Sequence, residues 1–172
     1  MALDTMLLRV IHIFSGVFWV GFAIFNIGFL QPAVKATGAE GLKVMQYLSG
    51  KTRLMPSIYA AATLTVLSGL IMYWPMAGSG SFMNTGYGLV LTIGATAGII
   101  GWLIAIISIR GVINGMGAVG KEMAIQEGPP SPDQMANMQA LSARLSKIGH
   151  IALVFMSLSL LAMSIARYTP NF

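Results

Sequence analysis

Apolar residues along this chain gather into four long runs that do not alternate with polar residues. The runs extend over about residues 10–30, 54–74, 89–109 and 148–166. A helix needs about 20 apolar residues to cross the hydrocarbon core of a bilayer. A continuous run of that length is typical of a helix and not of a membrane strand. The pattern therefore predicts an all-α fold, with one transmembrane domain built as a four-helix bundle.

Two of the connections between these runs have helical signals of their own. Thr37 and Glu40 have the spacing of a capping box, which predicts a short interfacial helix after the first span. Ser131 and Gln134 have the same spacing, with a proline at the first helical position, and the helical pattern then continues into the fourth span. The third run also continues past Arg110. We therefore expect helices 3 and 4 to extend into the cytoplasm.

The composition agrees with a membrane protein. The 172 residues are 56% hydrophobic and 9% charged, with a mean hydropathy of +0.77. Soluble domains are about 25% charged, so an ordinary soluble enzyme and a disordered chain are both excluded. The chain has no cysteine, which also excludes disulfides, iron–sulfur clusters, thiolate zinc sites and covalent c-type haem attachment.

The distribution of positive charge predicts the orientation. Eight of the ten Lys and Arg residues lie in or beside the two long connections, and Arg9 and Arg167 lie on the other side. The positive-inside rule then places both connections in the cytoplasm and both termini outside it, in the cell (inner) membrane. The first run reads as a retained span and not as a cleaved signal peptide. The expected partner is the lipid bilayer, and nothing indicates nucleic acid.

Two histidines, His12 and His150, are the ionisable residues that could carry chemistry inside the spans, because no Asp or Glu lies within them. Intramembrane ionisable residues are costly and are functional candidates. The lack of carboxylates argues against acid–base pairs, oxygen-ligand metal sites and hydrolase chemistry. Whether the protein is an enzyme stays open.

A stripe of polar and small residues headed by His12 follows one face of the first helix. Imidazole is an axial ligand for haem iron, and small neighbours leave room for a flat macrocycle. Near the same end, the second helix carries small residues and a methionine that is a candidate second ligand. Arginines at the outer surface are candidates to pair with haem propionates. The candidate cofactor-binding residues are His12, Ser15, Gly16, Trp19, Ser68, Gly69, Met72, Arg9 and Arg167.

His150 lies near the inner end of the fourth helix and is a second candidate metal ligand. With a rise of about 1.5 Å per residue, it should lie roughly 20–25 Å from His12 along the membrane normal. The two imidazoles are therefore not expected to bind one haem. Both histidines also have a purely structural interpretation, in which each ring hydrogen-bonds a neighbouring helix.

Two segments resemble a known group of membrane proteins. The segment LLRVIHIFSGVFWVGFAIFNIGFLQPAV has an early histidine and a Trp-x-Gly seven residues later, and it resembles the first helix of CopD-like proteins. The segment KTRLMPSIYAAATLTVLSGLIMYW resembles their next helix. Both features are similar to HemJ-type protoporphyrinogen oxidases, compact four-helix proteins that bind haem b through a histidine early in their first helix. The resemblance covers roughly residues 7–75, and His12 is the position that matches the ligand.

These observations lead to one expected function and two alternatives. We expect a protein that binds haem b and acts in electron transfer or porphyrin oxidation, with a membrane redox partner. One alternative is a non-catalytic membrane subunit or assembly factor with structural histidines. The other is a copper or small-solute permease, since the chain has 13 methionines and thioethers bind Cu(I). The pair Gly94 and Gly98 fits either internal helix packing or a homodimer.

Overall fold

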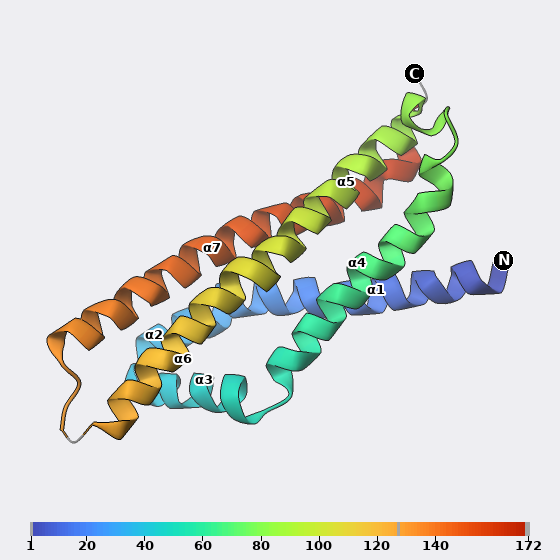
Figure 1. Cartoon of the computed structure of the whole chain (residues 1–172). Coiled ribbons are helices and arrows are strands. Elements are labelled where there is room, and N and C mark those ends of the chain that lie inside the picture. The colour runs from blue at the N-terminus through green and yellow to red at the C-terminus, as the bar shows by residue number, and fades with distance from the viewer. Residues whose placement is uncertain (1, 127, 171–172) are drawn as a thin grey trace.

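All regular structure in the described part of the chain is helical (Figure 1). The computed structural model describes residues 2–126 and 128–170. Four helices there are long and apolar enough to cross a membrane, and they cover Leu3–Thr37, Leu54–Ala77, Gly86–Ile125 and Pro132–Tyr168. Each of them contains one of the four apolar runs. The predictions of an all-helical fold and of four candidate spans are confirmed at this level.

The elements follow one another in a simple order. The first long helix consists of α1 (Ala2–Phe25), a π-helical turn (Asn26–Leu30) and α2 (Gln31–Thr37). After it come α3 (Ala39–Lys51), α4 (Leu54–Ala77) and a 3-10 turn (Phe82–Asn84). The third consists of α5 (Gly86–Leu103), a π-helical segment (Ile104–Ile109) and α6 (Arg110–Ile125). The last consists of α7 (Pro132–Ile165) and a 3-10 turn (Ala166–Tyr168). The third and fourth long helices therefore continue beyond their apolar runs, as predicted.

One of the two expected capping boxes forms and the other does not. At the start of α7, the Gln134 amide donates to Ser131 Oγ (3.2 Å) and the Ser131 amide donates to Gln134 Oε1 (2.9 Å). The box expected at Thr37 is wrong, because Thr37 is the last residue of α2 and its hydroxyl donates to the Ala33 carbonyl (2.8 Å). Gly38, with a φ of +58°, breaks the helix there, and α3 begins without a side-chain cap.

The first helix also runs further than the apolar pattern indicates. It was expected to end near Leu30, ahead of Pro32, but it continues to Thr37. The π-helical turn lies just before Pro32, so the change in hydrogen-bond register falls beside a residue that has no amide hydrogen to donate. Beyond it, α3 turns back against α2. A Cβ on Gly41 would collide with Thr37 Oγ1 and with the Val34 backbone.

The long helices associate mainly as two pairs, α1 with α4 and α5 with α7 (Figure 1). A buried cluster connects α1, α4 and α7, and it includes Trp19, Ile58, Ala62, Ala152 and Met156. Trp19 is only 5% exposed. The largest aromatic side chain of the predicted cofactor stripe thus belongs to the hydrophobic core.

Glycines on α5 allow α7 to approach closely. A Cβ on Gly94 would lie 3.0 Å from Ala162 Cβ and 3.3 Å from the Ser159 carbonyl oxygen. A Cβ on Gly98 would lie 2.9 Å from Ser159 Oγ. The face that carries both glycines is therefore filled by α7 of the same chain. Of the two roles expected for this pair, the structure shows internal helix packing.

Candidate functional site

A cluster of polar and small residues joins the middle of α1 to α4. His12 Nδ1 lies 2.8 Å from the Thr65 carbonyl oxygen and 3.5 Å from Ser68 Oγ. Thr65 Oγ1 lies 2.8 Å from Ser15 Oγ, whose hydroxyl donates to the Ile11 carbonyl (2.5 Å). The stripe predicted on the first helix and the one predicted on the second thus face each other.

The Thr65 carbonyl determines which nitrogen of His12 carries the proton. A carbonyl oxygen only accepts, so Nδ1 must donate, and the neutral ring then has its lone pair on Nε2. Within residues 2–126 and 128–170, Nε2 has no hydrogen-bond partner, and His12 is only half-buried. A histidine that binds a metal usually donates its other ring N–H to a carbonyl or carboxylate in this way.

We call the contact between α1 and α4 around His12 the α1–α4 seam. Two glycines in this seam lie directly against side chains of the opposite helix. A Cβ on Gly69 would lie 2.8 Å from His12 Cε1 and 3.1 Å from Nδ1. A Cβ on Gly16 would lie 3.4 Å from Thr65 Cγ2. The sequence suggested that small residues here leave room for a macrocycle. Beside Gly69, that room is filled by the imidazole itself.

Three other residues of the predicted set, Met72, Arg9 and Arg167, form no hydrogen bond with His12 in the described structure. Met72 is half-buried on α4, one turn beyond Ser68, and has no hydrogen bond to the ring. Arg9 is exposed on α1, three residues before His12. Arg167 is exposed at the end of the chain, where its guanidinium lies 5.4 Å from the centre of the Tyr168 ring. Nothing in the described residues pairs either arginine with the cluster.

His150 is exposed on α7 and belongs to a different level of the molecule. Its Nδ1 lies 2.7 Å from the Ser146 carbonyl oxygen of its own helix. The neighbouring Gly149 faces the side chain of Ile27, in the π-helical turn that follows α1. Ile27 follows His12 by fifteen residues, about 22 Å along the helix. The two histidines therefore cannot bind one metal ion within the chain.

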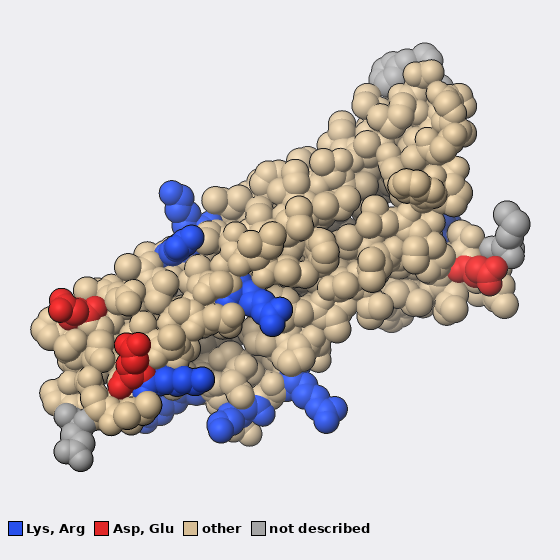
Figure 2. All heavy atoms as spheres, viewed as in Figure 1, with Lys and Arg blue, Asp and Glu red and all other residues tan. Residues whose placement is uncertain are grey.

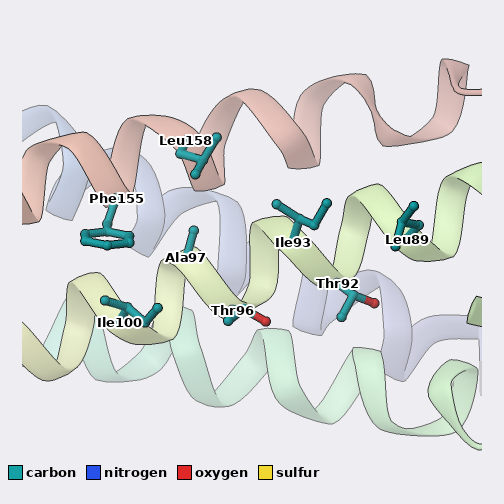
Figure 3. Close-up of a pocket in the computed structure, with 8 residues that line it drawn as sticks. All are labelled: Leu89, Thr92, Ile93, Thr96, Ala97, Ile100, Phe155 and Leu158. Atoms are coloured by element: carbon teal, nitrogen blue, oxygen red, sulfur yellow. The ribbon is translucent and has the colours of Figure 1, made fainter.

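Two open cavities in the described part of the structure do not include His12 in their lining. One of about 360 Å³ is lined by Leu70, Ile71, Trp74 and Pro75 of α4. The other, of about 290 Å³, lies along α5 and α7 (Figure 3). Its lining is almost entirely hydrocarbon, and the hydroxyl of Thr92 is already engaged with Tyr73 (2.8 Å). The described residues include no group of three or more His, Asp or Glu side chains able to hold a metal ion.

Within the cluster between α1 and α4, the imidazole of His12 is the group that would hold a haem iron. Imidazole Nε2 is the suitable atom, and its orientation is fixed from the Nδ1 side. No thioether and no second imidazole among the described residues forms a hydrogen bond with His12. The most important contributor that the sequence analysis missed is the Thr65 backbone carbonyl. The available signal was the glycine four residues after Thr65, because a residue at that position otherwise shields the carbonyl.

The comparisons with known proteins add no identification. Neither the family models, nor the curated proteins, nor the solved structures include a match to this chain.

Proposed function

We propose that this protein is integral to the cell (inner) membrane, where its four long helices form one bundle. The support is the exposure of large apolar side chains along all four helices, for example Phe14 (75%), Ile107 (67%) and Val154 (67%). Water would make such surfaces costly, whereas acyl chains cover them without penalty. Eight of the ten Lys and Arg residues lie on the side of α3 and of the tip between α6 and α7, so this side faces the cytoplasm. Both ends of the chain then face outward.

Single cysteines test this orientation, because the natural chain contains none. A membrane-impermeant maleimide added to intact cells should label the variant Gly80→Cys, in the connection between α4 and α5. It should label Ala136→Cys, near the start of α7, only after the cells are opened. Both positions are exposed, so access depends on the membrane alone. The reverse labelling pattern would overturn the orientation.

For the function itself, we propose binding of haem b with His12 as an axial ligand, in a redox role. The observation that carries this is the fixed tautomer of His12, with Nδ1 tied to the Thr65 carbonyl and Nε2 free of hydrogen bonds from described residues. When bound, haem would supply reversible one-electron chemistry of its iron. The seam residues would orient the ligand, since Thr65 holds the ring from the other side. Arg9, one turn toward the outer end, would supply positive charge for a propionate.

The rival function is a non-catalytic membrane subunit or assembly factor in which His12 only connects helices. One observation favours it. The imidazole hydrogen-bonds α4 and fills the space beside Gly69, so it already stabilises the α1–α4 pair without any cofactor. The two functions make different demands on the ring, because a structural role needs Nδ1–H and a ligand role needs Nε2.

The visible spectrum of the purified full-length protein distinguishes them. With haem supplied during expression, the wild-type protein should show a Soret band. His12→Ala should lose both that band and some stability, since one buried hydrogen bond contributes about 1 kcal/mol. His12→Asn is the informative variant, because its amide N–H can still reach the Thr65 carbonyl but nothing replaces Nε2. We expect His12→Asn to keep the free energy of unfolding of the wild type and to remain colourless. His150→Ala is the control and should keep the band.

Two outcomes would contradict the haem proposal. One is a folded wild-type protein that stays colourless after haem is supplied. The other is a Soret band that survives in His12→Asn at full intensity, because the iron would then be held elsewhere.

A further inference from the structure

Exposed cations gather toward one end of the molecule, just beyond the apolar spans. They come from α3, from the residue before α4, from the start of α6 and from α7. We call this group the basic collar, and its members are Lys51, Arg53, Arg110, Arg144 and Lys147. Figure 2 shows Lys and Arg gathered on this half of the molecule, with Asp and Glu at the tip beyond them and at the opposite end.

The buried core gives a reference for three of these residues, Arg53, Arg110 and Lys147, which all lie beyond it in the same direction. Ile58 and Ala152 belong to one core cluster, and Arg53 and Lys147 each lie five residues from it. Along their helices, both residues therefore lie about 7.5 Å from the core cluster, toward the same end of the molecule. Arg110 follows Gly101, which faces α7 near Ala152, by nine residues, or about 13.5 Å in the same direction.

No carboxylate neutralises the collar in the part of the chain that the structure describes. The ion pair seen there joins Lys43 to Glu40 (2.8 Å), both within the first turns of α3 and both exposed. Glu122 and Asp133 lie at the far ends of α6 and α7, more than ten residues from the nearest collar residue on their own helix. The described carboxylates therefore leave the positive charge of the collar uncompensated, and an anion from outside the chain can approach it.

The surface of α3 beside the collar indicates what kind of anion this is. Val44 and Tyr47 are exposed (54% and 64%), and Lys51 follows them on the same face of the helix. A helix face that combines exposed apolar side chains, a tyrosine and a lysine is typical of the boundary between acyl chains and headgroups. The collar thus borders a surface suited to lipid and not to a soluble polyanion.

We infer that the basic collar binds the phosphate headgroups of anionic phospholipids in the cytoplasmic leaflet. The guanidinium groups of Arg53 and Arg110 suit phosphate oxygens, with which arginine forms paired hydrogen bonds. Cations just beyond the cytoplasmic end of a membrane span attract anionic lipid, and this attraction falls off within about 10 Å at moderate salt. This inference rests on the proposed membrane placement of the chain.

Spin-labelled lipids test the inference on the full-length protein reconstituted in phosphatidylcholine vesicles. The spectra report the fraction of each labelled lipid that is immobilised at the protein surface. We expect labelled phosphatidylglycerol to associate about fivefold more strongly than labelled phosphatidylcholine, and the preference to fall as salt is raised. The triple variant Arg53→Gln, Arg110→Gln, Lys147→Gln should bring the ratio close to one.

A matched variant controls for net charge. Lys35→Gln, Lys43→Gln, Lys121→Gln removes the same number of positive charges from exposed positions outside the collar, and it should keep the preference. The inference is overturned if the wild type shows no preference for phosphatidylglycerol, or if both triple variants lose it equally. If neither labelled lipid is immobilised at all, the membrane placement fails as well, so the two failures are distinguishable.

Discussion

Gly69→Ala is expected to lower the free energy of unfolding by about 2 kcal/mol and to abolish the haem binding that we propose for His12. The added methyl group would lie 2.8 Å from His12 Cε1, closer than two carbon atoms pack. The imidazole would have to leave the Thr65 carbonyl, which releases its Nδ1 hydrogen bond and turns Nε2 away from its present direction. One methyl group on α4 would thus disturb a ligand on α1.

Detergent-solubilised protein, unfolded by heat or denaturant, gives the stability, and the Soret band gives the haem content. Gly21→Ala is the matched control, since it lies in the same long helix as His12 and has nothing within 4 Å of an added Cβ. It should be neutral or slightly stabilising, because alanine favours a helix over glycine.

The double variant His12→Ala, Gly69→Ala provides the decisive comparison. With the imidazole gone, the methyl group has nothing to displace, so Gly69→Ala should cost much less in that background than in the wild type. Two residues in direct contact give such a non-additive result. Strictly additive costs would mean that the ring does not rest against Gly69.

Gly94→Leu is expected to have the larger effect on stability, a loss of about 3 kcal/mol. Even a Cβ at this position would lie 3.0 Å from Ala162 Cβ and 3.3 Å from the Ser159 carbonyl oxygen. The second contact is with backbone, which cannot rotate aside, so α5 and α7 must separate to admit the larger side chain. Leucine is a good helix former, and the loss would therefore come from packing and not from helix propensity.

Gly21→Leu makes the same change on an apolar helix face with open space, and it should be tolerated. Size-exclusion chromatography in detergent, run beside the unfolding measurement, separates two roles of Gly94. A variant that changed from dimer to monomer without losing stability would show that this glycine contacts a second copy, which contradicts the α5–α7 packing.

Much of this molecule follows from one-dimensional pattern. Four apolar runs of about 20 residues predict four long helices because a helix must satisfy all its backbone hydrogen bonds internally when acyl chains surround it. The start of α7 at Ser131 was equally predictable, since a serine, a proline and a glutamine at fixed spacing satisfy the free amides of a first turn. The grouping of His12 with Ser15 on one face needed only the helical repeat.

The tertiary structure decided which neighbour each face meets. Helical periodicity shows that Gly94 and Gly98 share a face, but it contains no information on whether α7 or a second copy covers that face. The same holds for the seam, where His12 donates to the Thr65 carbonyl. Every residue has a carbonyl, and only the approach of α1 to α4 across Gly69 makes this one available. Thr37 ends α2 in place of capping α3, since its hydroxyl donates to the Ala33 carbonyl of its own helix and α3 turns back at Gly38. Local sequence thus determined the helices, and contacts between residues distant in sequence determined the site.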